Sequence, residues 1–419
     1  MTPRGWAGLA LAVLAALLVT VVASRVPWQR PPAPRADQLA ALADLPAAEV
    51  ARGRAFHAAL RPGTYGGIVA GLVVALLLGL TPLGAALVAS VGRPLGGNWI
   101  AQAVLGGLAV VLVADLLTLP FAAWRHVVLV RYGLSTQGWG GWIVDLLKSY
   151  AVSAVIGAVA LLGFYTVTRY APRWWWAFGA VGAAALVTLL SFVVPVLVEP
   201  IFNRFTPMEP GPLRTELMAL AEADGVPVRD VLVADASRRT RAVNAYVSGF
   251  GPTRRIVVYD TLLREAPPAE VASVVAHELG HAKERDVLTG TLTGALGAAA
   301  AVVALYLLGS WGALLRAAGV GSVAEPRAFP LIVAVVTVAG VLAAPAQAWV
   351  SRRVEARADA HALALTGDPA AFEAMQRRLS RVNLADPDPP RWVYLYSASH
   401  PSTVERMAAA RAYARGAGG

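Results

Sequence analysis

The sequence predicts an all-α polytopic membrane protein with a smaller α+β domain outside the bilayer. Of its 419 residues, 57% are hydrophobic and only 15% are charged, whereas a typical soluble domain has about 25% charged residues. The mean hydropathy is +0.57. The hydrophobic residues also gather in runs of about 20, the length that an α-helix needs to cross a bilayer. These observations exclude a single soluble globule, a disordered chain and a collagen-like fibre.

Seven windows are apolar and long enough to form membrane-spanning helices. They cover residues 5–24, 66–89, 100–124, 151–167, 175–198, 288–308 and 329–350. The first window could also be a cleaved secretory signal, with residues 22–24 before the cleavage site. Because this apolar run is longer than the usual signal core of about 7–15 residues, we expect it to remain as a helix. The tryptophans at 174–176 are typical of a membrane interface.

The distribution of basic residues predicts the orientation in the membrane. The connections on one side hold more Arg and Lys than those on the other, and the richer side is normally cytoplasmic. The richer side has Arg25, Arg30, Arg35, Arg52, Arg54, Arg61, Arg125, Arg131 and Lys148, against Arg4, Arg93, Arg169, Arg173, Arg316 and Arg327. We therefore expect the N-terminus outside and the large polar regions in the cytoplasm. The preference for Arg over Lys is typical of a GC-rich genome, which points to a bacterial cell membrane.

Two polar blocks remain, and we expect them to fold together into one domain. The predicted order is a membrane region with five spans (1–198), a first polar block (199–286), spans six and seven (287–350) and a second polar block (351–419). The two blocks together are large enough for one modest domain. Many basic residues lie in short connections between spans, so the net charge of +10 indicates membrane lipids as partners and no nucleic acid.

A metal-binding motif lies in the first polar block, where His277, Glu278 and His281 form the pattern H-E-x-x-H. On a helix, residues i and i+4 share a face, so both imidazoles can bind one ion. Glu278 is rotated by about 100° from His277, which directs its carboxylate to a water beside the metal. The chain has no Cys, which excludes thiolate sites. No role is predicted for the remaining histidines His57, His126 and His361.

The third metal ligand is expected to be a carboxylate from the second polar block. No further His follows His281 closely enough to bind the same ion, and a catalytic zinc needs three protein ligands and one open position. Glu355 and Asp359 are four residues apart, so they share one helical face. Glu355 could bind the metal while Asp359 holds a ligand histidine through its second nitrogen. Asp286 is a rival for that supporting role, and a merely solvated helix face is the alternative for Glu355 and Asp359.

The order of several motifs resembles a known family. The segments that carry the resemblance are 119–121, 131–137, 199–207, 244–246, 255–262, the zinc motif and 351–359. Together they resemble the type I CAAX prenyl protease family of integral-membrane zinc endopeptidases over nearly the whole chain. The related HtpX-type quality-control proteases share the zinc core but have fewer spans, so seven spans favour the first family.

This resemblance implies a fold and a ligand set. The expected fold is a helical membrane barrel around a chamber, closed by a gluzincin-type α+β zinc protease domain. One Zn²⁺ ion would be held by His277, His281 and Glu355. The resemblance further implies that His400, in the C-terminal His-Pro motif, stabilises the oxyanion. Asn244 would contact the substrate, and Arg406 would position the C-terminal tail by ion pairing.

We therefore expect a zinc metalloendopeptidase in which Glu278 acts as the general base. The substrate would be a peptide or protein that is lipid-modified or otherwise associated with the membrane. The family name implies removal of a C-terminal tripeptide beyond a prenylated Cys, and a broader HtpX-like specificity is the alternative. A transporter or receptor with a structural zinc is a distant third reading, because a structural site does not need the base. The β-prone segment 255–259 is expected either as an edge strand that binds an extended peptide or as a buried core strand.

Overall fold

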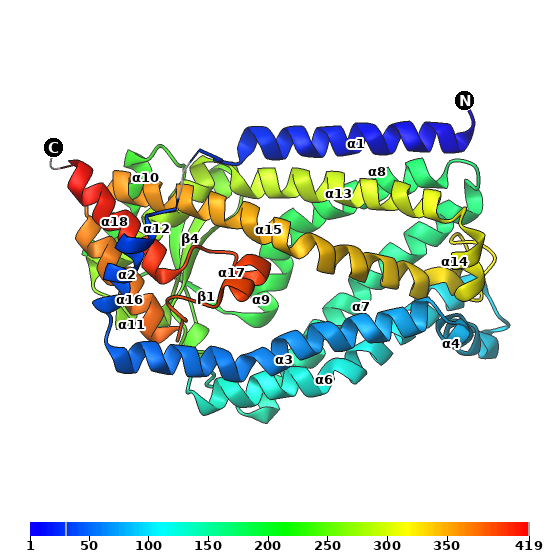
Figure 1. Cartoon of the computed structure of the whole chain (residues 1–419), viewed down its shortest axis with the longest axis horizontal. Coiled ribbons are helices and arrows are strands. Elements are labelled where there is room, and N and C mark those ends of the chain that lie inside the picture. The colour runs from blue at the N-terminus through cyan, green and yellow to red at the C-terminus, as the bar shows by residue number, and fades with distance from the viewer. Residues whose placement is uncertain (30–31, 418–419) are drawn as a thin grey trace.

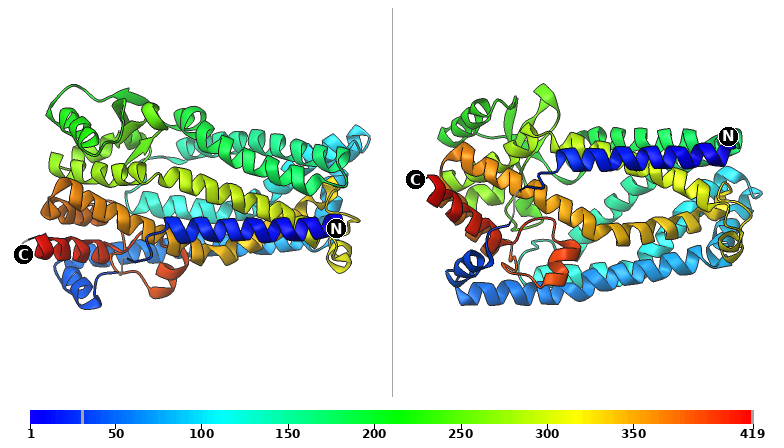
Figure 2. Two further views of the ribbon diagram at one scale, coloured as in Figure 1. Left: turned by 90° about the horizontal axis from the view of Figure 1, so that it is seen from above. Right: turned by 45° about the horizontal axis from the view of Figure 1, so that its top comes forward.

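The computed structural model describes residues 1–29 and 32–417 and confirms a helical membrane protein with a small sheet. Long helices run side by side along the long axis of the molecule (Figures 1 and 2). The sheet and the C-terminus lie at one end, and the N-terminus lies at the other (Figure 1). Both polar blocks are therefore gathered at one end of the helical bundle, with the β-strands among them.

Seven helices in the described residues are long and apolar enough to cross a membrane, as the sequence predicts. Large apolar side chains such as Val155 and Val181 lie exposed on them, as expected where lipid replaces water. Within these spans, η2 (Gln102–Gly106) and η3 (Val194–Val198) are π-helical turns. The spans are α1 (Pro3–Arg25), α3 (Ala47–Gly79), α5–η2–α6 (Trp99–Arg131), α7 (Trp139–Tyr170), α8–η3–α9 (Trp175–Phe202), α13 (Asp286–Leu308) and η6–α15 (Pro326–Thr366).

The second predicted window was wrong in its placement, because residues 66–89 do not form one helix. α3 ends at Gly79, and a separate helix α4 (Pro82–Gly92) begins after a break. Pro82 has no backbone N–H and suits the first position of a helix. The Thr81 hydroxyl accepts a hydrogen bond from the Leu83 N–H at 3.3 Å and so caps the new helix. The second span is instead completed at the N-terminal side, where α3 starts at Ala47.

The first helix packs into the bundle rather than standing apart from it. α1 lies along α13 (Figure 1), and Ala7 is completely buried in the cluster that also contains Ala299 and Val303 of α13. After α1, the short helix α2 (Arg35–Ala43) packs on the C-terminal helix α18 (Thr403–Ala417). Asp37 of α2 and Arg415 of α18 form an ion pair of 3.0 Å across this contact. The connection between the first two spans is therefore part of the polar end of the molecule.

The sheet has four strands in the order β1–β2–β4–β3. β2 (Asp230–Ala234) and β4 (Arg255–Tyr259) are parallel and central, while β1 (Phe205–Pro207) and β3 (Ala245–Ser248) pair antiparallel at the two edges. The possibility that 255–259 offers an edge to a peptide is therefore wrong. β4 contributes the fully buried Ile256 and Val258 to the core, and the edge strand is β3.

Helices complete the polar end around this sheet. α10 (Pro212–Ala223), α11 (Asp260–Glu265) and α12 (Pro268–Lys283) belong to the first block. The second block continues α15 without a break through residue 351 and then forms α16 (Pro369–Val382), α17 (Arg391–Ser397) and α18. The short helices η1 (Arg93–Leu95), α14 (Gly312–Ala317), η4 (Ala236–Arg238) and η5 (Gly251–Thr253) lie in connections.

Candidate metal centre

The helix α12 presents the two motif histidines because its other face is anchored in the core. Pro268 begins the helix at a position that requires no N–H donor. Val271, Val275 and Leu279, spaced by four residues, are completely buried against the sheet. This fixes the rotation of α12 and directs His277 and His281 to the opposite side, toward α15. Their Nε2 atoms are 3.1 Å apart.

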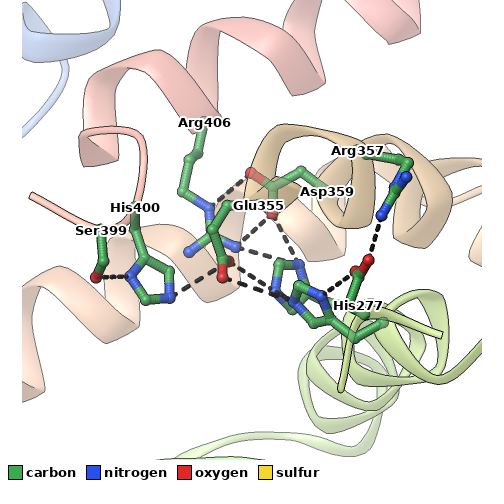
Figure 3. Close-up of polar contacts among 9 residues, drawn as sticks. His277, Glu355, Arg357, Asp359, Ser399, His400 and Arg406 are labelled. Carbon is green, nitrogen blue, oxygen red and sulfur yellow. Dashed lines mark hydrogen bonds and ion pairs between the residues drawn. The ribbon is translucent and has the colours of Figure 1, made fainter. Parts of the chain in front are cut away.

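α15 brings the third group to this pair. Glu355 Oε2 lies 3.2 Å from His277 Nε2, and Glu355 Oε1 lies 3.7 Å from His281 Nε2. One ligand atom from each of the three residues lies within 4.8 Å of the others. Figure 3 shows His277 and Glu355 facing each other across the two helices. The structure thus brings together the three residues that the sequence predicts as ligands.

The second nitrogen of each histidine is held by its own carboxylate. His277 Nδ1 lies 2.9 Å from Asp359 Oδ1, and His281 Nδ1 lies 2.9 Å from Asp286 Oδ2. The sequence presented these carboxylates as rivals, yet both take part. In neutral rings the Nδ1 atoms carry the protons, so both Nε2 atoms present lone pairs. Two lone pairs that face each other at this distance repel unless a cation lies between them.

Three further observations fit a metal ion. Glu355 Oε2 is buried and accepts no hydrogen bond from the residues that the structure describes. The ligand atoms of a tetrahedral zinc, with bonds of about 2.0–2.1 Å, lie about 3.3 Å apart, close to the spacings seen here. Burial lowers the pKa of the His281 imidazole, but the carboxylates of Asp286 and Glu355 outweigh this and raise that pKa to about 10. The site therefore favours a positive charge.

Glu278 lies beside this centre and opens onto a cleft of about 640 Å³. The cleft also exposes His277, Asn244, His400 and Arg406 among its walls. Burial raises the pKa of the Glu278 carboxyl, which makes it a stronger base than an exposed glutamate. The arrangement can place a water between a metal ion and a carboxylate able to accept its proton.

His400 and Arg406 reach the centre from the C-terminal segment. His400 Nε2 lies 3.3 Å from Glu355 Oε2, and the Ser399 hydroxyl lies 2.9 Å from His400 Nδ1 (Figure 3). When that hydroxyl donates to Nδ1, the imidazole proton is on Nε2, the ring atom that lies nearest Glu355. Arg406 Nε donates to Asp359 Oδ2 at 2.9 Å. Arg406 therefore holds the carboxylate that holds His277.

Several residues of the site carry no signal in the sequence. The Arg357 guanidinium pairs with Asp286 and donates to the backbone carbonyl of Arg25 at 3.1 Å (Figure 3 shows Arg357). Asp224, which is buried, accepts from Lys283 Nζ at 2.7 Å and lies 3.1 Å from His361 Nε2. Asp224, at the end of α10, thus links His361 of α15 to Lys283 of α12. These contacts depend on helix placement that local sequence patterns do not encode.

Comparisons with known proteins agree with this geometry. Residues 207–414 match the family described as "Peptidase family M48", and residues 63–204 match "CAAX prenyl protease N-terminal, five membrane helices". The chain is 31% identical over 319 residues to the CAAX prenyl protease 1 homolog of Oryza sativa subsp. japonica, covering 73% of this chain and 72% of that one. It is 29% identical over 301 residues to the uncharacterized metalloprotease YhfN of Bacillus subtilis, covering 71% of this chain and 70% of that one.

A solved structure shares the fold. The crystal structure of S. mikatae Ste24p matches with a TM-score of 0.78 and 21% sequence identity, and the match covers 97% of this chain and 98% of that one. The likeness of fold therefore extends over almost the whole chain.

Proposed function

The chain belongs to the CAAX prenyl protease family within peptidase family M48 and is an integral-membrane metalloendopeptidase, and from this premise we propose that it is a zinc enzyme with a single Zn²⁺ ion. His277, His281 and Glu355 would bind the ion. The observation that carries this proposal is the convergence of two Nε2 atoms on the Glu355 carboxylate, whose buried Oε2 accepts no hydrogen bond among the described residues. Asp359 and Asp286 would orient the two imidazoles.

The chain's own residues divide the remaining work of peptide hydrolysis. Zinc supplies a Lewis acid for the scissile carbonyl and lowers the pKa of water toward about 7. The Glu278 carboxylate accepts the proton of the attacking water and then delivers it to the nitrogen of the leaving amine. His400 donates from Nε2 to the negative charge that develops on the carbonyl oxygen. Asn244, at the start of the edge strand β3, binds the peptide backbone, and Arg406 keeps Asp359 in place.

The substrate that we propose is a membrane-associated peptide with a prenylated Cys near its C-terminus. The rice relative is named for that activity, and its match extends over about three quarters of this chain. An HtpX-like enzyme of broader specificity is less well supported, because the match to the CAAX protease N-terminal region covers the membrane helices as well. A non-enzymatic transporter or receptor has no need of the Glu278 carboxylate. Nucleic acid is not expected as a partner.

We place the metal centre on the cytoplasmic side of a bacterial cell membrane. The N-terminus and the protease domain lie at opposite ends of the bundle (Figure 1). The connections that carry the excess of Arg and Lys, such as the one with α2, lie at the protease end. Because cytoplasmic connections carry that excess, the protease end faces the cytoplasm.

Two substitutions separate the roles of base and ligand. We expect Glu278→Gln to keep about one zinc per chain while cleavage of a farnesylated peptide falls by about 10³-fold or more. Glu355→Gln should lose zinc, since a neutral amide is a poor zinc ligand. Zinc content by mass spectrometry and peptide cleavage are measured on the same preparations. Full cleavage by Glu278→Gln, or full zinc in Glu355→Gln, would refute the assignment.

A chelator adds a second readout that does not depend on activity. Removal of zinc should lower the midpoint of thermal unfolding of the wild type and of Glu278→Gln, because a ligand bound only to the folded state stabilises it. The Glu355→Gln protein should show no such shift. Equal shifts in all three proteins would mean that the chelator acts elsewhere.

A further inference from the structure

A second pocket adjoins the catalytic cleft and shares one wall with it. The pocket has a volume of about 350 Å³ and lies between the end of α6, the segment 134–137 and the start of α7. Thr240 lines both this pocket and the cleft of the metal centre. Thr240 is fixed there by a β-bridge to Ser135 and by a hydrogen bond from its hydroxyl to the Leu134 carbonyl at 3.1 Å. The two cavities are therefore neighbours along one rigid wall.

The lining of this pocket is mixed, because Ala122, Leu129, Leu134 and Trp142 are apolar and two arginines lie among neutral polar residues. The two arginines are Arg125 and Arg239, and the neutral polar residues are Ser135, Gln137 and Thr240. No Asp or Glu is among its lining residues within the described part of the chain. Two arginines in a lining without a carboxylate favour an anion, and a planar guanidinium is suited to a carboxylate.

Arg239 has a carboxylate partner, whereas Arg125 has none among the described residues. Arg239 Nη1 lies 3.6 Å from Asp145 Oδ2, and Gln137 Nε2 donates to the same oxygen at 2.6 Å. Arg125 has no hydrogen-bond or ion-pair partner among residues 1–29 and 32–417. Its stem is nevertheless packed, because an added Cβ at Gly63 of α3 would lie 2.8 Å from Arg125 Cγ. Arg125 is thus an exposed cation with a packed stem, and no carboxylate among the described residues pairs with its charge.

The spacing from this pocket to the metal centre matches a short peptide. Thr240 and Asn244 are four residues apart, and four residues of extended chain span at most about 14 Å. Asn244 lines the cleft together with His277 and Glu278. A peptide that lies antiparallel to this segment, as an added strand on β3 would, passes from the metal centre to the pocket in about three to four residues.

We propose that this pocket is a subsite for the C-terminal carboxylate of the peptide substrate and that Arg125 binds that carboxylate. The proposal rests on the proposed endopeptidase function. It explains how the enzyme would select a peptide bond at a fixed number of residues from the C-terminus of its substrate. A phosphate group of a lipid is the competing anion. The peptide is favoured because the pocket shares the wall at Thr240 with the catalytic cleft.

The test compares two farnesylated peptides that differ only at the C-terminus, one with a free carboxylate and one with an amide. Binding is measured on full-length protein carrying Glu278→Gln, so that recognition is read without hydrolysis. We expect the acid to bind about tenfold more tightly than the amide, as for one charge-assisted hydrogen-bonded pair. Adding Arg125→Gln should abolish this ratio by weakening only the acid, and Arg125→Lys should restore most of it.

Arg131→Gln is the matched control, since it removes an arginine from the same helix. Six residues turn an α-helix by about 240° relative to the starting side chain, and Arg131 does not line the pocket. This variant should keep the wild-type ratio. In active protein, Arg125→Gln should raise KM for the acid about tenfold with kcat nearly unchanged, because the contact is the same in ground and transition states.

Three results would overturn the subsite. The first is equal affinity for the acid and the amide. The second is an equal loss of affinity for both peptides in Arg125→Gln. The third is a loss of affinity that appears only in vesicles containing phosphatidylglycerol and is the same for both peptides. The last result would assign the pocket to a lipid phosphate. A preference for the acid in binding, combined with no cleavage by the zinc-loaded wild type, would instead support the subsite and refute the proposed function.

Discussion

Gly280 lies between the two motif histidines at a point where no side chain fits. A Cβ added there would lie 2.9 Å from His361 Cδ2 and 3.1 Å from His361 Cβ. The absence of a side chain lets α15 approach α12 closely enough for Glu355 to reach both imidazoles. The distance between α12 and α15 therefore depends on Gly280. The spacing of His277, His281 and Glu355 depends on it as well.

Gly280→Ala should therefore damage the metal centre although it leaves every ligand in place. The added methyl group pushes α15 away, at a cost of about 1–3 kcal/mol, and we expect zinc affinity to fall by about tenfold or more. Zinc titration followed by mass spectrometry measures this. Gly290→Ala on α13 is the control, because nothing lies within 4 Å of a Cβ at that position. Equal zinc affinity in both variants would show that the close approach is not required.

The proposed metal ligands and both candidate supporting carboxylates could be named from the sequence, whereas the histidine that each carboxylate holds could not. His277 and His281 follow from helical periodicity alone, and Glu355 follows from the chemistry of a third ligand. Asp286 could not be ranked against Asp359, because its position depends on the left-handed backbone of Arg285 (φ 57°) at the corner between α12 and α13. The sequence has no marker for that corner.

Among the elements, the edge strand β3 is held in place from outside the sheet. Asn383 follows α16, and its side chain makes two hydrogen bonds to the backbone of Val243. The Asn383 carbonyl accepts from the Val243 N–H at 2.9 Å, and the Asn383 amide donates to the Val243 carbonyl at 3.1 Å. This two-point contact fixes the residue before Asn244 and so the start of the edge that we propose for peptide binding.

Asn383→Ala should weaken substrate binding more than it affects the metal. Two backbone groups of Val243 lose their partners, which costs about 1–3 kcal/mol for partly buried groups. We expect KM for a farnesylated peptide to rise about tenfold with zinc content unchanged. Asn98→Ala removes another side-chain to backbone contact, to Ile100 N at 2.8 Å, at the far end of the bundle and should leave KM unaltered. A normal KM in Asn383→Ala would contradict this role.

Hydropathy predicted which helices exist more reliably than it predicted the residues at which they begin and end. The break between α3 and α4 interrupts a run that is apolar throughout, and only Thr81 and Pro82 mark it. For 255–259, a run of β-branched residues fits both an edge and a central strand. Its place in the sheet depends on pairing with β2, which lies more than 20 residues away in sequence and leaves no local pattern.

At the scale of the whole molecule, the protease end and the end with the N-terminus lie at opposite ends of the helical bundle (Figure 1). We expect them on opposite sides of the membrane. α14 lies at the same end as the N-terminus, and α10 lies at the protease end (Figure 1). The chain has no Cys. A single introduced Cys is therefore the only thiol in the protein.

Single-cysteine labelling should report the orientation. With the protease end in the cytoplasm, a membrane-impermeant maleimide should label Ala313→Cys on α14 in intact cells. It should label Glu222→Cys on α10 only after the membrane is permeabilised. Both positions are exposed, and the unmodified chain, which should stay unlabelled, is the control. The reverse labelling pattern would place the metal centre outside the cell.

Because α15 runs without interruption from the membrane to the metal centre, the position of Glu355 depends on the tilt of that helix in the bilayer. Glu355 lies ten residues, or about 15 Å of helix, after Pro345, which stands inside α15 and weakens its backbone hydrogen bonding there. A bend of about 5° at Pro345 would move Glu355, about 15 Å further along the helix, by about 1.3 Å, whereas metal–ligand bonds tolerate about 0.2 Å. Bilayer thickness influences helix tilt. A thinner or thicker membrane would therefore change the position of Glu355 relative to His277 and His281.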